Sequence, residues 1–96
     1  MSINNPTKFL KAVSDPSRQK IMAVLRKHGE MNVGDIRAAV GLRQPTVSQH
    51  LKVLSEAEVV RSRRRGQEVF YSLCNEVIYD VIAGFMKKFV KDKVNT

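Results

Sequence analysis

Two helical segments separated by a short glycine-containing turn constrain the fold of this chain more than any other feature of its sequence. Val33, Ile36 and Val40 recur at the i, i+3, i+7 spacing of a helix, and Gly41 follows them directly. Helical spacing resumes at Gln44, after only two intervening residues, Leu42 and Arg43. Because so few residues lie between the two segments, we expect two short helices that meet at a tight turn.

Two further helices are predicted before this pair. The first is amphipathic and lies around Thr7 to Val13, within a terminal segment of about 5–13, and the second covers about residues 16–28. Asn32 can cap the third helix. The signals for the first two are the apolar residues Phe9, Leu10 and Val13, the N-cap residue Asp15, Pro16 at the first helical position and the stop residue Gly29.

From Val59 onward the pattern changes to β-branched and aromatic residues. It predicts strands at Val59 to Arg64 and Gln67 to Leu73, with Arg65-Gly66 as the hairpin turn. Helical spacing returns from Asn75 to about Lys91, with more apolar positions than one buried face requires. No repeat or linker divides the chain, so we expect one domain over residues 1–96. Its fold class is mainly α with a small β-hairpin, a winged helix-turn-helix in the order α-α-α-α-β-β-α.

The helix that begins at Gln44 has a polar face. Val47, Leu51 and Leu54 lie on one side, and short polar side chains lie on the other. Most such faces are solvated surfaces, but a helix about 10–12 Å across fits the major groove of B-DNA, where short polar residues near its N-terminus reach base edges. We therefore predict DNA contacts from this helix by Gln44, Pro45, Thr46, Ser48, Gln49, His50 and Lys52.

The predicted ribbon is rich in arginine, because four of the five residues 61–65 are Arg. A guanidinium is planar and always charged, so it can lie along phosphates or enter a narrow minor groove. Strand alternation sends Arg61 and Arg63 to one face and Ser62 and Arg64 to the other, so not every arginine can meet DNA at once. Charge also protects an edge strand from aggregation, and both roles can hold together. The predicted ribbon contacts are Arg63, Arg64, Arg65 and Gln67.

The overall charge agrees with a polyanionic partner. The 96 residues include 17 Lys and Arg against 9 Asp and Glu, a net charge of +8 that is typical of chains that bind nucleic acid or an acidic surface. No apolar run approaches the ~18 residues that span a bilayer, so we expect no membrane insertion. Residues 1–6 lack a secretion signal and Cys74 cannot form an internal disulfide, which predicts a cytoplasmic protein. No nucleophile, base and cofactor loop converge, so an enzyme is not expected.

Three stretches are similar to motifs of a known family. They are Asp15-Pro16-Ser17-Arg18 at the start of the second helix, Pro45 to Leu54 and Arg63 to Leu73. Together they resemble the ArsR-type winged-helix repressors over nearly the whole chain. The resemblance implies a homodimeric transcriptional repressor, and we expect its two recognition helices to bind double-stranded DNA at an imperfect inverted repeat. It also implies a dimer interface made by the terminal helices (about 5–13 and 75–91), with Phe9, Leu10, Val13, Ile78, Ile82, Phe85 and Phe89 as candidate residues.

The resemblance does not extend to metal ligands. Metal-sensing members open the third helix with Glu-Leu-Cys-Val-Cys-Asp-Leu, where this chain has Glu30-Met31-Asn32-Val33-Gly34-Asp35-Ile36. Soft metals need converging Cys or His donors, and the chain has three such residues in total. We predict no metal site and no cofactor. Two further departures are Arg43, where Ser or Thr commonly caps the recognition helix, and Glu58, where glycine commonly ends it.

Two other functions fit the same residues. A winged helix can serve as a protein-interaction module, with its basic charge incidental. Competition between an acidic partner and duplex DNA separates this alternative from DNA binding. A redox- or metal-responsive repressor is the second alternative, in which Cys74 would be the redox switch, although a free cysteine is more often a small buried apolar residue.

Overall fold

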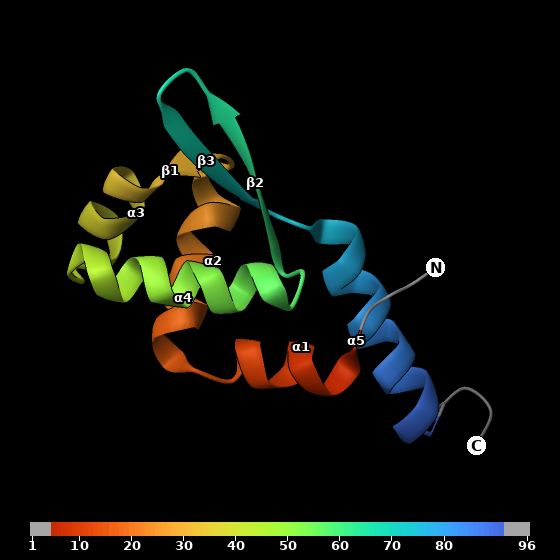
Figure 1. Ribbon diagram of the computed structural model, residues 1–96. Coiled ribbons are helices and arrows are strands. Elements are labelled where there is room, and N and C mark those ends of the chain that lie inside the picture. Colours follow the sequence, from red (N-terminus) through yellow and green to blue (C-terminus); the bar gives the residue numbers. More distant parts are fainter. Residues whose placement is uncertain (1–4, 92–96) are drawn as a thin grey trace.

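Five helices and a three-stranded antiparallel sheet follow one another along residues 5–91, the part of the chain that the computed structural model describes (Figure 1). The elements are α1 (Pro6–Val13), α2 (Pro16–His28), β1 (Met31–Asn32), α3 (Val33–Val40), α4 (Gln44–Glu56), β2 (Val60–Arg65), β3 (Glu68–Leu73) and α5 (Asn75–Phe89). Helices α3 and α4 form the helix-turn-helix, and β2 and β3 form the wing, so the predicted winged helix-turn-helix is confirmed. The ends of the predicted 1–96 domain, residues 1–4 and 92–96, lie outside the described residues.

Local capping explains where the first three helices begin and end. The side chains of Asn5, Asp15 and Asn32 each accept a hydrogen bond from the backbone N–H three residues on, at 3.2 Å, 3.0 Å and 2.8 Å. Gly29 and Gly41 end α2 and α3 with φ angles of 83° and 73°, which glycine adopts without a Cβ clash. The predicted caps Asp15 and Asn32 and both glycine stops are therefore confirmed, and Asn5 is an additional cap.

Glu58 ends α4 in a conformation that usually requires glycine. Its φ is 63°, the one positive φ of a non-glycine residue among residues 5–91. The Glu58 N–H donates to the Ser55 carbonyl at 3.0 Å and the Val59 N–H to the Leu54 carbonyl at 2.9 Å, the two bonds of a Schellman motif. Val59 and Leu54 are both fully buried, which supplies the apolar contact that this motif favours. The motif turns the chain from α4 directly into the wing.

The inner face of α4 lies within the hydrophobic core. Val47, Leu51 and Leu54 are at most 1% exposed. Full burial of a side chain of this size contributes about 1.5–3 kcal/mol relative to exposure, so rotation of this face outward would be costly. The opposite, polar face is therefore fixed toward solvent. The other members of the core cluster are Phe9, Ala12, Ile21, Leu25, Met31, Ile36, Val40, Ala57, Val59, Val60 and Val81.

The wing turn lies one residue later than the sequence predicts. Arg65 pairs with Glu68, so Gly66 and Gln67 make the two-residue turn in place of the predicted Arg65-Gly66. Gly66 has a φ of 61°, and a positive φ at the first turn residue suits a type II′ hairpin, in which glycine is favoured there. Strand β2 accordingly begins and ends one residue later than the predicted Val59 to Arg64. Strand β3 begins one residue later than the predicted Gln67 to Leu73 and ends at Leu73 as predicted.

A third strand, which the sequence did not predict, pairs with the wing. Met31 and Asn32 form β1, antiparallel to β3 and opposite Tyr71 and Phe70. Two residues are too short for an alternating pattern to show, so the periodicity gave no signal for this strand. With β1 present, β3 is the central strand and β2 lies at the edge of the sheet. The middle of β3 is thereby tied to the start of α3.

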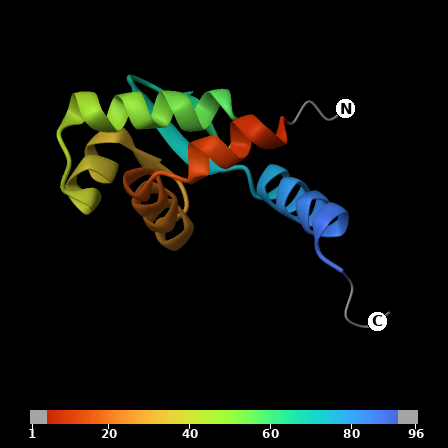
Figure 2. The ribbon, with the colours of Figure 1, turned by 90° about the horizontal axis from the view of Figure 1, so that it is seen from below.

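Helix α5 ends at Phe89, two residues before the predicted Lys91, and several of its apolar side chains are exposed. It extends from the base of the wing past α1 and away from the other helices (Figure 2). Ile82, Phe85 and Phe89 are 39%, 40% and 65% exposed. Of the other residues predicted at a dimer interface, Leu10, Val13 and Ile78 are partly buried against the core, and Phe9 is a core residue of one chain, 1% exposed.

Replacement of Glu58 with glycine is expected to stabilise the fold by about 0.5–1 kcal/mol, because a left-handed conformation costs a residue that carries a Cβ atom. Urea unfolding followed by circular dichroism measures the change. Glu56→Gly, within the last turn of α4, is the matched control and is expected to destabilise by about 0.5–1 kcal/mol. A loss of stability in Glu58→Gly would contradict this account of the helix end.

Candidate nucleic-acid interface

The outer face of α4 carries the side chains predicted to read bases. His50 is half-buried at one edge of this face. The first turn of α4 contains no acidic residue, and its N-cap Arg43 makes no side-chain capping bond. The first-turn N–H groups and the positive end of the helix dipole therefore suit a phosphate. The exposed residues of the face are Gln44, Pro45, Thr46, Ser48, Gln49 and Lys52.

Arg18 of α2 joins α4 to the end of α1. Its Nη1 lies 3.2 Å from Nδ1 of His50. Its Nε donates to the Ala12 carbonyl at 2.6 Å and its Nη2 to the Lys11 carbonyl at 3.4 Å, both at the end of α1. A guanidinium only donates hydrogen bonds, so in this contact Nδ1 of His50 is the acceptor, and Nε2 remains available to another partner. Sequence reasoning noted Arg18 within a family motif but gave it no role.

Strand alternation divides the wing arginines between two faces. Val60, at the start of β2, is 3% exposed and points into the core. Ser62 and Arg64 follow it on the same side of the strand, and Arg61 and Arg63 lie on the opposite side. Arg65 shares the side of Arg63, whereas the predicted contact Gln67 lies in the exposed turn.

Arg64 differs from its three arginine neighbours. Within the described residues, no salt bridge, side-chain hydrogen bond or aromatic ring contact holds its guanidinium. Arg64 can therefore reach a phosphate without breaking an existing contact. Each arginine on the opposite side of β2 has a partner. Arg61 Nη2 lies 3.1 Å from Glu76 Oε1, and Arg63 donates to both carboxylate oxygens of Glu30 at 2.5 Å and 2.8 Å. The Arg65 guanidinium lies 5.0 Å from the centroid of the Phe70 ring.

The Arg63–Glu30 pair changes the ionisation of both partners. Hydrogen bonds from Arg63 lower the pKa of the Glu30 carboxyl below its ordinary value of 4.5 and raise the pKa of the Arg63 guanidinium. The same kind of effect occurs at the start of α2, where the Arg18 N–H lowers the pKa of the Asp15 carboxyl. Glu30 was missed as a wing partner because β1, which brings it beside the wing, had no sequence signal.

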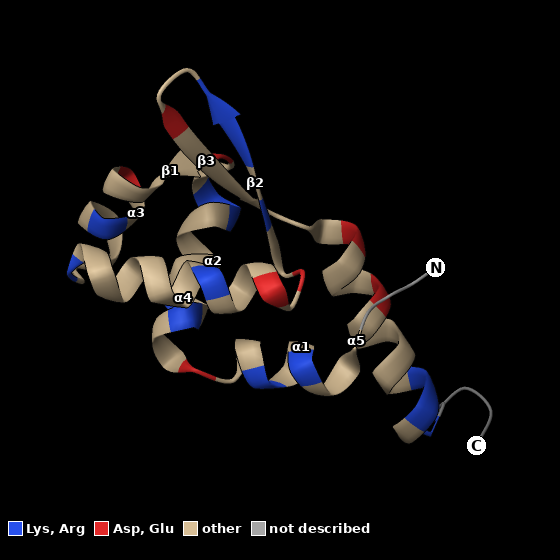
Figure 3. Cartoon of the chain, viewed as in Figure 1, with Lys and Arg blue, Asp and Glu red and all other residues tan. Residues whose placement is uncertain are grey.

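Positive charge is prominent on the wing (Figure 3). Basic residues cover most of β2, and others lie on α1, α2 and α4, whereas the first half of α5 carries acidic residues. The concentration of basic residues on β2 makes the wing suited to contact with a polyanion.

Cys74 lies at the junction of the wing and α5, where it is 6% exposed. The Arg61 Nε lies 3.3 Å from its Sγ atom. In the described part of the chain, no three His, Cys, Asp or Glu side chains converge as metal ligands. Over the same residues, no helix has the length and apolar character needed to cross a bilayer.

Comparisons with known proteins give a consistent result. The sequence model described as "Bacterial regulatory protein, arsR family" matches residues 15–62. The chain is 42% identical to the transcriptional repressor SdpR of Bacillus subtilis (strain 168) over an aligned region of 80 residues, and this region covers 83% of this chain and 87% of that protein. It is 37% identical to the transcriptional repressor PagR of Bacillus anthracis over an aligned region of 82 residues, and this region covers 85% of this chain and 82% of that protein. The crystal structure of NolR from Sinorhizobium fredii is similar with a TM-score of 0.70 and 31% identity, over 90% of this chain and 85% of that chain.

The lowered pKa of Glu30 predicts a contribution to stability that depends on pH. A depressed carboxyl pKa stabilises the folded state above the ordinary value of 4.5, and this contribution is lost as the pH falls through the folded-state pKa. Wild type is therefore expected to melt at a higher temperature than Glu30→Gln at about pH 7, and this difference should shrink as the pH is lowered below 4.5. Differential scanning calorimetry across this range provides the measurement. A difference that persists undiminished at the acid end would contradict the account.

Proposed function

This chain belongs to the arsR family of bacterial regulatory proteins and is a DNA-binding transcriptional regulator, and we propose that it acts as a homodimeric, sequence-specific repressor. The observation that carries the proposal is the exposed polar face of α4, held outward by a buried apolar face and accompanied by a basic wing. The relatives SdpR and PagR are named transcriptional repressors, which supports repression as the outcome of binding.

The proposed base contacts come from the N-terminal half of α4. Gln49 is exposed, and its amide can both donate to and accept from adenine in the major groove. Thr46 and Ser48 can contact bases or phosphates, and Lys52, one turn on, is better placed for the backbone. His50 can donate from Nε2 to a phosphate, since Arg18 occupies its other ring nitrogen. Gln44 and Pro45 complete the contacting surface at the start of the helix.

The proposed phosphate contacts come mainly from the wing. Arg64 has a guanidinium without a partner among residues 5–91, so it can bind a phosphate or enter the minor groove at little cost. Gln67 and Arg65 lie at or beside the exposed turn and would approach the same flank of the DNA. Arg63 is also a predicted contact, but it lies on the opposite side of β2 from Arg64 and its guanidinium is already bound to Glu30.

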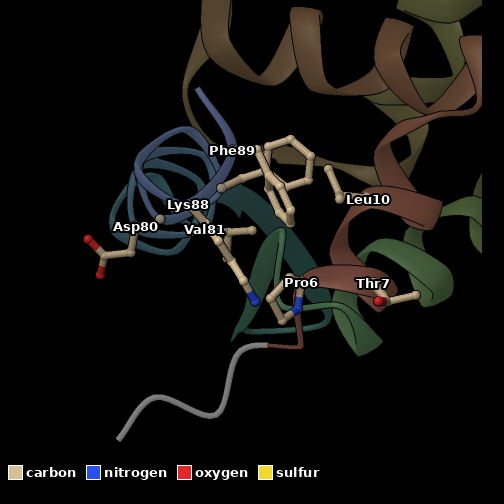
Figure 4. A pocket seen from close by; sticks show the side chains of 9 residues that line it. Pro6, Thr7, Leu10, Asp80, Val81, Lys88 and Phe89 are labelled. Carbon is tan, nitrogen blue, oxygen red and sulfur yellow. The ribbon is translucent and has the colours of Figure 1, made fainter. Parts of the chain in front are cut away.

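The dimer interface is proposed to lie at α1 and α5. A hollow of about 600 Å³ separates the two helices, and Leu10, Val81, Phe85 and Phe89 are among the residues that line it (Figure 4). The Phe85 and Phe89 rings lie 4.8 Å apart between centroids and continue the apolar surface along α5. Exposed apolar surface of this kind is typical of an interaction site, and a twofold-related copy would cover it on both chains at once. Phe9 is omitted from this interface because it is a core residue.

A twofold dimer predicts the form of the operator. Two α4 helices related by a twofold axis enter successive major grooves, about 34–36 Å apart, so the site would be an imperfect inverted repeat. Regulation through a cysteine metal site is not part of this proposal, since the one cysteine is buried against Arg61.

Binding is expected to fall steeply with salt, because each neutralised phosphate releases counterions with a slope of about −0.9 in log K against log salt. Gln49→Ala should weaken a preferred site by about 1–3 kcal/mol and random DNA far less, whereas Arg64→Ala should weaken both about equally. Gel shift on the upstream region of its own gene, over a salt series, provides the measurement. Equal losses for Gln49→Ala on both DNAs would reject base reading by Gln49, and binding insensitive to salt would reject the proposed interface.

Phe89→Glu is expected to shift the protein from dimer to monomer, because it places a charge on the proposed interface. Phe89 is 65% exposed in one chain, so the substitution should not unfold it. Sedimentation equilibrium reports the change in mass. Lys87→Glu, on the opposite side of α5 by helical spacing, is the control and should remain a dimer. A dimer that survives Phe89→Glu with an unchanged dissociation constant would place the interface elsewhere.

A further inference from the structure

We propose that Glu30 withholds Arg63 from DNA, so that the wing of each chain neutralises phosphate through Arg64 and not through Arg63. The inference rests on the proposed DNA-binding function and extends it to an acidic residue outside the interface. On this account Glu30 limits the affinity for DNA, and its removal strengthens binding.

The sheet topology brings Glu30 beside the wing. Glu30 directly precedes β1, and β1 pairs with β3, which pairs with β2 in turn. Asn32 lies opposite Phe70 and Arg63 lies opposite the same residue from the other strand. Since side chains alternate along β1, Glu30 and Asn32 share one side of the sheet with Arg63. This is the side that faces away from the core.

The contact occupies the part of the Arg63 guanidinium that a phosphate would use. Its Nε and Nη2 groups donate to the two carboxylate oxygens of Glu30, at 2.5 Å and 2.8 Å. Such a two-bonded fork is the same geometry by which arginine binds a phosphate. A phosphate that approached Arg63 would therefore compete with Glu30 for the same donors and would meet a like charge.

Glu30 is the less exposed partner of this pair. The Arg63 side chain is 57% exposed and the Glu30 side chain 29%. Departure of Arg63 toward DNA would leave a half-buried carboxylate without its cation, next to the DNA backbone. Movement of Arg64 toward DNA would break no ion pair, because no acidic side chain in the described residues holds its guanidinium. The two neighbouring arginines therefore differ in their availability, although the sequence makes them look equivalent.

Salt dependence of DNA binding separates the two arginines. We would measure fluorescence anisotropy of a labelled duplex of mixed sequence, from about 50 to 300 mM salt, for wild type, Glu30→Gln, Arg63→Ala, Arg64→Ala and the double variant of Glu30→Gln with Arg63→Ala. Glu30→Gln is expected to steepen the slope by about 0.9 for each chain bound and to raise affinity several-fold at the lowest salt. Arg64→Ala should reduce the slope by about the same amount. Arg63→Ala should change the slope of the wild-type protein much less than Arg64→Ala does, and it should abolish the gain in Glu30→Gln.

Glu76→Gln is the matched control for net charge. It changes the net charge by the same amount as Glu30→Gln and removes the salt bridge of Arg61, which lies at the base of the wing beside α5. The slope is expected to stay at the wild-type value in this variant. Thermal melts without DNA establish that each variant is folded at the temperature of the assay.

Two results would overturn the proposal: a Glu30→Gln variant whose slope and affinity equal those of wild type, or an Arg63→Ala loss as large as that of Arg64→Ala. An equal gain in Glu76→Gln would also overturn it, because net charge alone would then explain the effect. Wild-type protein that fails to bind the duplex at every salt concentration would overturn the proposed function, and this inference with it.

Discussion

The burial of Val47, Leu51 and Leu54 orients the whole of α4, and the interface depends on that orientation. A helix with one face locked into the core must present its other face to solvent, whatever that face carries. Two polar devices add to the apolar contacts. Arg18 joins His50 to the end of α1, and the Schellman motif at Glu58 directs the chain from α4 into β2. The recognition helix and the wing are therefore positioned by adjoining parts of one core rather than by a flexible connection.

The basic residues of this chain are numerous, and those of the wing also have defined positions. The net charge of +8 attracts any polyanion, but net charge alone does not determine where or in which orientation a polyanion binds. In the wing, Arg63 and Arg61 are held by carboxylates from the α2–β1 turn and from α5, whereas Arg64 has no such partner among the described residues. On our proposal, this contrast between paired and available arginines sets how many phosphates each chain can neutralise. It also couples the wing to α5, the helix that the dimer would share.

The sequence predicted helix positions well where local signals were strong, and it failed where contacts were distant. Helix α2 begins and ends at the residues predicted from Asp15, Pro16 and Gly29, because capping is a local property. The predicted wing turn was wrong by one residue. A turn at Arg65-Gly66 and a turn at Gly66-Gln67 are each flanked by two segments rich in β-forming residues, so the sequence pattern did not distinguish them. The roles of Glu30 and Arg18 depend on partners 33 and 32 residues away, which no local pattern reports. Phe9 was predicted at an interface and is a core residue, because periodicity shows that a face is apolar but not what covers it. The contacting residues of α4 and the wing remain predictions.

The central claim is that the outer face of α4 and the Arg64 side of the wing meet DNA together. Amide chemical-shift mapping of the isotope-labelled protein during titration with duplex DNA tests it most directly. The account predicts that the largest shifts fall at Thr46, Gln49 and Arg64, with little change in the middle of α5. Shifts confined to α5, or to the side of the sheet that carries Arg61, would contradict the account and would place the DNA on another surface.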